Sequence, residues 1–158
     1  MDLTRDELAG VVDVLGPVTV DEVGRACSEL AFKRGEDADP GGFAGDVEDA
    51  LDSYHLVRVA DHEADTEAPL LVVGPAAFPE IPEGAADLPH ILDLPERRVD
   101  REGAARAAEE RFREDAVVAV RAGDDERIAA LLDVSYELEA WGPVDLASVR
   151  ERLDDASE

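Results

Sequence analysis

Several residue types that often carry chemistry are scarce in this sequence. It has no Asn or Gln, one Lys, one Cys and seven aromatic residues among 158. A single cysteine excludes an internal disulfide framework and a zinc site built from paired cysteines. The longest apolar stretch, APLLVVGPAAF, is too short to span a membrane, and the N-terminal MDLTRDEL lacks the apolar core of a secretory signal. We therefore expect a soluble, cytoplasmic protein that does not contact a membrane.

Acidic residues dominate what is present. Asp and Glu number 40 against 15 Lys and Arg, which gives a formal net charge of −25. The excess of acidic residues is spread evenly along the chain, with net charges of −13 over residues 1–79 and −12 over residues 80–158. A hydrophobic content of 45% with clear periodicity argues against disorder. At about 1 M salt the Debye length is roughly 3 Å, so such self-repulsion is screened. The composition is typical of a folded protein adapted to high salt.

The first half of the chain predicts a small α+β domain. Thr4 and Thr19 are each followed three residues later by a glutamate, the pattern of a capping box at a helix start. Apolar residues then recur at helical spacing, and PVTV between the two helices reads as a short extended segment. A third helix over 43–54 precedes two strand candidates, HLVRVA and PLLVVG. This order of elements predicts a winged-helix-like domain over 1–78.

The second half predicts mostly helix. Residues 79–96 contain four prolines, which break helix interiors, so we expect a linker or an irregular strap, with LPHIL packed on a surface. From 97 to 154 the apolar spacing is helical, with breaks at GDDE and at Gly142-Pro143. The predicted fold class is α+β, a winged-helix-like N-terminal domain followed by a mostly helical C-terminal region.

Binding of DNA in the usual winged-helix manner is disfavoured by charge. A recognition helix needs Arg or Lys for guanine and phosphate, or Asn or Gln for adenine. The predicted helix 43–54 has none of these residues, and the predicted wing 60–68 carries four acids with no Arg or Lys. High salt weakens phosphate attraction as well. We therefore expect no nucleic-acid contact through either element.

The one locally basic segment spans residues 97–113, with six arginines against four acids. It reads either as a solvated helix with internal ion pairs or as a site for an acidic partner. The densest aromatic patch, DVSYELEAWGPVDL, either packs the helical region or supplies an interface anchor. The candidate partner-binding residues are Arg97, Arg98, Arg101, Tyr136 and Trp141.

Catalytic and metal sites find little support. The loop DHEAD gathers carboxylates around His62, but it lacks the spacing of a known calcium or zinc motif. His55 and His90 have no evident ligand partner, and Cys27 lies on a helical apolar stripe that predicts burial. No phosphate-binding, dinucleotide-binding or nucleophile-elbow motif is present. We expect no catalytic residue, cofactor or metal.

Four segments also carry a resemblance to a known group of proteins. LTRDELAGVVD, DLPHILD, ERRVDRE and LLDVSYELEAWGPVDL resemble a family of short, acidic haloarchaeal proteins of uncharacterised function over nearly the full length. The element order of the first half is similar to that of archaeal transcription regulators. The resemblance implies a salt-adapted archaeal source and no particular activity.

The function expected from these observations is non-enzymatic. We expect a protein-interaction or regulatory accessory module in which the winged helix is a protein-binding scaffold, with another protein or a second copy as partner. An alternative is a transcription regulator that contacts DNA through a face near Arg97–Arg113. A third is a small enzyme whose site the sequence does not disclose.

Overall fold

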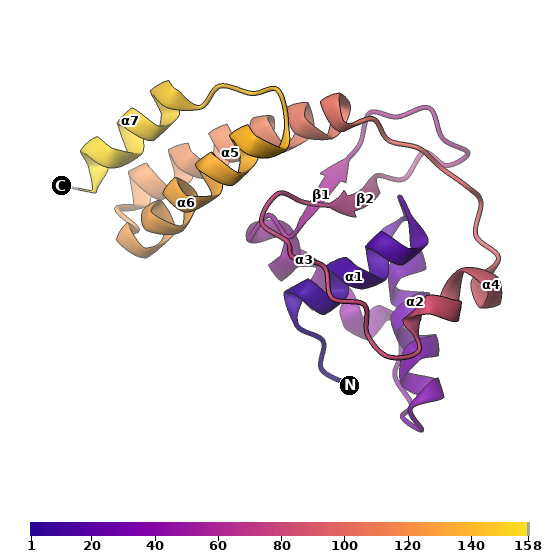
Figure 1. Cartoon of the computed structure of the whole chain (residues 1–158). Coiled ribbons are helices and arrows are strands. Elements are labelled where there is room, and N and C mark those ends of the chain that lie inside the picture. The colour runs from indigo at the N-terminus through magenta and orange to yellow at the C-terminus, as the bar shows by residue number, and fades with distance from the viewer. Residues whose placement is uncertain (158) are drawn as a thin grey trace. The chain divides into compact units, whose positions relative to one another are not determined.

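The computed structural model describes residues 1–157 and divides the chain into two compact units, Met1–Val99 and Asp100–Glu158. The first unit is α+β and the second is helical (Figure 1), which confirms the predicted α+β class with a mostly helical C-terminal region. In the first unit the elements are α1 (Arg5–Leu15), α2 (Val20–Lys33), a 3-10 turn (Pro40–Phe43), α3 (Ala44–Asp52), β1 (Leu56–Val59), β2 (Leu70–Val73), a second 3-10 turn (Ala85–Asp87) and α4 (Leu88–Leu92).

Both predicted capping boxes are present. The Thr4 hydroxyl accepts from the Glu7 backbone N–H at 3.0 Å, while the Glu7 carboxylate accepts from the Thr4 N–H at 3.0 Å. Thr19 and Glu22 repeat the arrangement at the start of α2, at 3.2 and 2.9 Å. Each box satisfies two backbone donors that have no partner inside the helix, so it fixes where the helix begins.

The sheet is small and antiparallel. β1 pairs with β2, with Leu56 opposite Val73 and Val59 opposite Leu70. Val18, between α1 and α2, adds one bridge to Leu71 on the other edge of β2. This bridge confirms the short extended segment expected in PVTV.

The core of the first unit lies between α1, α2, α3 and the sheet. Its buried residues are Leu8, Ala9, Val12, Val18, Val23, Cys27, Phe43, Val47, Ala50, Leu51, Leu56 and Leu71. Those in α1, α2 and α3 fall on one stripe of each helix, which leaves the opposite faces to the acidic residues. Cys27 is fully buried, as its position on the apolar stripe predicts.

The proline-rich segment 79–96 packs against the helices of the first unit. The Glu80 N–H donates to the Asp6 carbonyl at 3.0 Å, and its backbone passes so close to Gly10 that a Cβ there would overlap the Glu80 carbonyl. Further on, α4 buries Leu88 against Leu30 and neighbouring residues of α1 and α2. The LPHIL sequence therefore packs on a surface, as expected.

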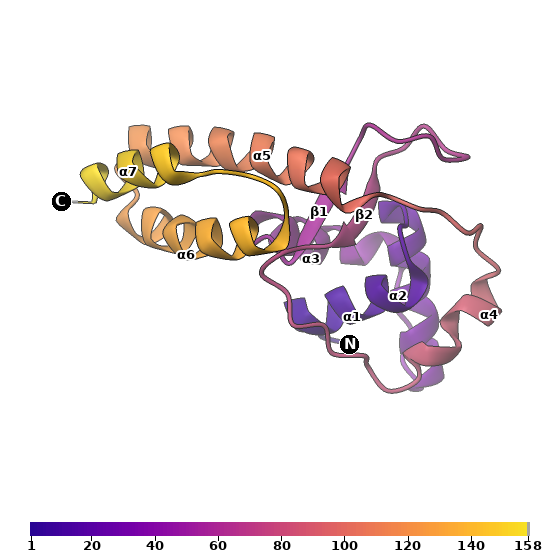
Figure 2. The same cartoon turned by 45° about the horizontal axis from the view of Figure 1, so that its top comes forward.

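Three helices form the second unit, α5 (Arg101–Ala122), α6 (Asp125–Trp141) and α7 (Ala147–Ala156). Gly123 takes a left-handed conformation (φ 63°) and Asp124 caps α6, so α5 and α6 form a hairpin with a very short turn. The two helices lie side by side in both views (Figures 1 and 2), and α7 contacts each of them. Their shared core includes Ala108, Phe112, Leu131, Leu138 and Leu153. No helix within residues 1–157 is both long and apolar enough to cross a membrane.

Candidate functional site

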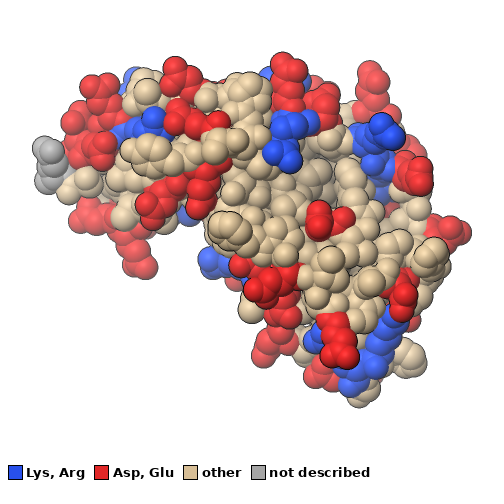
Figure 3. All heavy atoms as spheres, in the orientation of Figure 1, with Lys and Arg blue, Asp and Glu red and all other residues tan. Residues whose placement is uncertain are grey.

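The exposed surface of α3 is acidic. Asp46, Glu48, Asp49 and Asp52 are all exposed, whereas Val47, Ala50 and Leu51 turn toward the core. The nearest strand contributes one cation, Arg58, and its guanidinium pairs with Glu48 at 2.8 Å. Acidic side chains also outnumber basic ones over the face in Figure 3. The helix that would read DNA in a winged helix thus presents carboxylates to solvent.

The loop between β1 and β2 is acidic as well, and His62 holds part of it together. Asp61, Glu63, Asp65 and Glu67 are exposed. His62 Nδ1 accepts from the Ala64 N–H at 3.2 Å, so Nε2 carries the ring proton that is shared with the Ala68 carbonyl at 2.8 Å. Both ring nitrogens are therefore occupied. Residues 1–157 contain no group of three or more His, Cys, Asp or Glu side chains placed to hold a metal ion.

Arg97 ties this loop to the start of α2. Its side chain is 4% exposed and forms a two-pronged ion pair with Glu22, in which Nη2 donates at 3.0 Å. Its Nε donates to Asp65 Oδ1 at 2.7 Å. We call these three residues the Arg97 clasp. The hydrogen bonds to Glu22 and Asp65 raise the pKa of the Arg97 guanidinium, and the hydrogen bond from Arg97 holds the pKa of the Asp65 carboxyl below its usual range. Arg97 is thus committed to contacts within the first unit.

Arg98, next to it, is exposed and has no hydrogen-bond or ion-pair partner in residues 1–157. The other three predicted partner-binding residues belong to the second unit. Arg101 lies over the Trp141 ring, 4.5 Å from its centroid, and donates to the Trp141 carbonyl at 3.0 Å. Tyr136 is 60% exposed and has Arg150 over its ring at 4.3 Å.

Tyr136 and Trp141 do not share one face of α6. Five residues at about 100° each separate them by about 140° around the helix axis. Each ring is covered by a different arginine, because Arg101 comes from the start of α5 and Arg150 from α7. The aromatic patch of the sequence is therefore two separate cation–π pairs, each worth about 0.5–1 kcal/mol at an exposed site.

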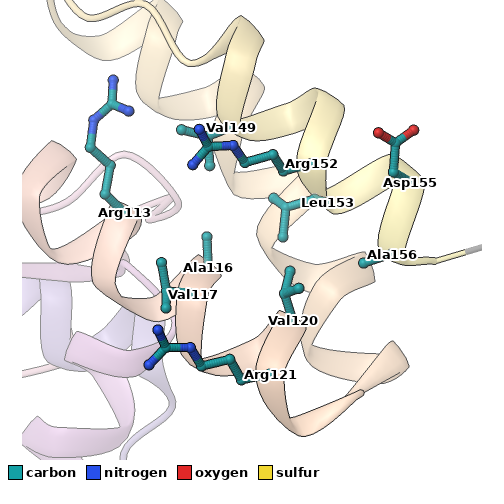
Figure 4. Close-up of a pocket in the computed structure, with 10 residues that line it drawn as sticks. All are labelled: Arg113, Ala116, Val117, Val120, Arg121, Val149, Arg152, Leu153, Asp155 and Ala156. Carbon is teal, nitrogen blue, oxygen red and sulfur yellow. The ribbon is translucent and has the colours of Figure 1, made fainter.

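A groove between α5 and α7 was not predicted from the sequence. Its volume is about 620 Å³, and its lining residues are Arg113, Ala116, Val117, Val120, Arg121, Val149, Arg152, Leu153, Asp155 and Ala156. In Figure 4 the apolar side chains of α5 and α7 face one another, and the three arginines extend from the same region. We call it the α5–α7 groove. Val117 and Val120 give the signal that was missed, since they lie off the buried stripe of α5.

Cys27 is the one thiol of the chain, and it is inaccessible. Burial, and secondarily the charge of Asp46, raises its pKa to about 12. At neutral pH such a group is almost entirely in the thiol form, which is a poor nucleophile. His55 pairs with groups of the first unit, at 2.7 Å from the Ser53 hydroxyl and 3.6 Å from Asp6.

Comparison with the models of known families gives a match. The model of a family of unknown function (DUF7109) matches residues 6–158. No curated protein matches the chain, and no solved structure does. The expected membership of an uncharacterised family is confirmed by this match.

Proposed function

We propose that this chain, which belongs to the DUF7109 family of unknown function, is a non-enzymatic protein-interaction or regulatory accessory module of a salt-adapted, haloarchaeal cytoplasm. In this proposal the first unit is a winged-helix-like scaffold, because its order is α1, the bridge at Val18, α2, α3, β1, a loop and β2. The second unit supplies a surface for a partner protein.

The observation that carries the proposal is the α5–α7 groove. Val117 and Val120 line it and keep 44% and 39% of their surface exposed, although the second unit has a well-filled core elsewhere. Concave apolar surface that a fold leaves open is typical of a binding site for a partner or ligand. Its arginines also distinguish it from the acidic surface of α3.

Two observations disfavour the DNA-binding alternative. The exposed acids of α3 and of the loop 60–69 would repel phosphate. The arginines of segment 97–113 are also largely occupied: Arg97 in its clasp, Arg101 over Trp141, Arg106 with Glu102, Arg111 with Asp115 and Arg113 with Glu109. Arg98 alone remains, which is too little for a phosphate-binding face. Cys27 does not support the enzyme alternative, because burial raises the pKa of its thiol to about 12 and so makes it a poor nucleophile.

Affinity capture tests the proposal. Tagged protein is recovered from native lysate in multimolar KCl, with and without nuclease, and its companions are identified by mass spectrometry. We expect a stoichiometric protein partner that survives nuclease and is lost with Val120→Glu, because a charge in the lining of the groove opposes apolar contact.

Val118→Glu is the matched control. Val118 lies on the same helix and is 66% exposed, but it does not line the groove. It should leave the partner bound. Recovery that disappears with nuclease would favour the DNA-binding alternative instead, and a partner retained by Val120→Glu would place the contact elsewhere on the protein.

A further inference from the structure

The charge around the α5–α7 groove runs against that of the rest of the chain. Acids outnumber bases 40 to 15 overall, yet the groove is lined by Arg113, Arg121 and Arg152 with Asp155 as its one acid. Arg113 is partly engaged by Glu109 at 3.2 Å and by the Asp145 carbonyl at 3.4 Å. Neither Arg121 nor Arg152 has a hydrogen-bond or ion-pair partner within the described residues 1–157.

Arg121 and Arg152 differ in sequence context from the paired arginines of α5. Three other arginines of α5 pair with an acid four residues away, in Glu102–Arg106, Glu109–Arg113 and Arg111–Asp115. Four residues before Arg121 stands Val117, and four residues before Arg152 stands Ser148. Neither arginine thus has an acid one turn before it. Asp125, four residues after Arg121, lies beyond the end of α5, and Asp155, three residues after Arg152, forms no ion pair with it within residues 1–157. Apolar lining residues lie beside both cations.

We propose that the α5–α7 groove binds the apolar face of an acidic amphipathic helix from a partner protein, and that carboxylates beside that face pair with Arg121 and Arg152. This inference rests on the proposed function and specifies which kind of protein segment the groove would bind. The lining of α5 runs from Arg113 to Arg121, a rise of about 12 Å at 1.5 Å per residue. Apolar side chains at positions i, i+3 and i+7 of a helix span about 10.5 Å, so two turns of a partner helix match the groove.

The charge arrangement favours a protein segment of this kind. Arginine pairs carboxylates in a two-pronged geometry, and such contacts act at direct-contact distance, where salt screening is weakest. A partner from the same salty compartment would carry acidic residues around its apolar face, as α2 and α3 of this chain do. Apolar contact is not weakened by salt in the way that distant charge attraction is.

A charge-swap experiment tests this chemistry. The probe is a fluorescent synthetic helix of about four turns, with leucines at i, i+3 and i+7 and glutamates on either side. A second probe carries lysines in place of those glutamates, and a third carries alanines in place of the leucines. Each is titrated against the full chain by anisotropy in the lowest KCl concentration that preserves the native circular dichroism spectrum.

We expect the glutamate probe to bind, the alanine probe to fail, and the lysine probe to bind at least about tenfold more weakly. In the double variant Arg121→Glu, Arg152→Glu the preference between glutamate and lysine probes should reverse. Arg98→Glu, at an exposed arginine of the first unit, is the control and should leave both affinities unchanged.

Three results would overturn the inference. The first is a glutamate probe whose affinity is unchanged by the double variant. The second is a wild-type chain that is a dimer in solution and becomes monomeric with Val120→Glu, since a second copy would then occupy the groove. The third is failure of the glutamate probe to bind. If Val120→Glu still abolishes capture of a cellular partner in that third case, the proposed function stands and only the partner chemistry is wrong.

Discussion

Arg97 and Glu22 lie 75 residues apart in the sequence and form a largely buried, two-pronged ion pair, with side chains that are 4% and 12% exposed. Glu22 is also the glutamate of the α2 capping box. One carboxylate therefore defines where α2 begins and holds the end of the strap, while Arg97 extends the link to Asp65 in the loop 60–69. The loop that a winged helix would use as its wing is anchored to the body of the first unit.

Loss of Arg97 should destabilise the first unit. Arg97→Met keeps the apolar stem but removes the guanidinium, which leaves the Glu22 carboxylate partly buried without its main partner. We expect the free energy of unfolding to fall by about 2 kcal/mol. Hydrogen bonds to charged groups are worth about 1.5–3 kcal/mol, and the loss is moderated here because solvent reaches part of this site. Thermal unfolding in high KCl, followed by circular dichroism, measures it.

Arg98→Met is the matched control for that experiment, since Arg98 is adjacent, exposed and without an ion-pair partner in residues 1–157. It should change stability by less than about 0.5 kcal/mol. Equal melting temperatures for the two variants would show that the clasp contributes nothing to stability.

The same clasp predicts sensitivity to acid. Partial burial raises the pKa of Glu22, but hydrogen bonds from Arg97 and from the Thr19 backbone, with the charge of Arg97, outweigh it, so the net pKa is lowered. A lowered native-state pKa gives stability that is fully present above the unfolded pKa, about 4.3 for Glu, and is lost as the pH falls through the native value. The difference in melting temperature between wild type and Arg97→Met should therefore be constant near neutral pH and shrink below about pH 4.3.

Wild type and variant share the other carboxylates, so the general effect of protonating them cancels in this difference. If the difference in melting temperature widened in acid, Arg97 would not be stabilising the ionised form of Glu22 in the folded state. Measurements at constant KCl from neutral pH down to the acid limit of reversible unfolding decide between the two.

The features that the sequence predicted are those governed by neighbours in the chain. Capping boxes depend on residues three positions apart, so Thr4–Glu7 and Thr19–Glu22 could be read directly. Helical apolar spacing likewise gave the burial of Cys27 and of the α5 stripe. Four-residue spacing also indicated ion pairs within this helix, but not which acid each arginine takes: Arg106 was expected to pair with Glu110 and pairs with Glu102 instead.

Features that depend on distant segments were not predicted. The pairing of Arg97 with Glu22 and Asp65 joins three segments whose approach depends on the tertiary fold, so Arg97 was assigned to a partner surface by local charge alone. The α5–α7 groove has the same origin, since Val117 and Val149 line one groove only when α7 packs back on α5. Local charge and spacing do not specify such contacts.

Two glycines should respond oppositely to substitution by alanine. At Gly10, in α1, a methyl group would overlap the backbone carbonyl of Glu80, so the strap would have to move. At Gly45, in α3, the same methyl group meets nothing within 4 Å. We expect Gly10→Ala to cost about 2 kcal/mol through overpacking, and Gly45→Ala to stabilise by about 0.5 kcal/mol through helix propensity. Thermal unfolding compares them, and a stabilising Gly10→Ala would contradict the close packing of strap and helix.

Trp141 provides an optical probe of the second unit, because it is the single tryptophan of the chain. Arg101 covers its ring at 4.5 Å and also donates to its carbonyl at 3.0 Å. Arg101→Ala should shift the tryptophan emission to longer wavelength as water reaches the ring, and should destabilise the second unit by about 0.5–1 kcal/mol. Arg106→Ala is the control, since Arg106 is exposed on the same helix and pairs with Glu102 at 3.5 Å. It should leave the emission unchanged, whereas equal shifts for the two variants would mean that the stacking of Arg101 does not shield the ring.

The same emission can also follow binding of the glutamate probe. If probe binding shifts the wild-type emission, and Arg101→Ala leaves the affinity for the probe unchanged, then Trp141 reports on the α5–α7 groove without forming part of it.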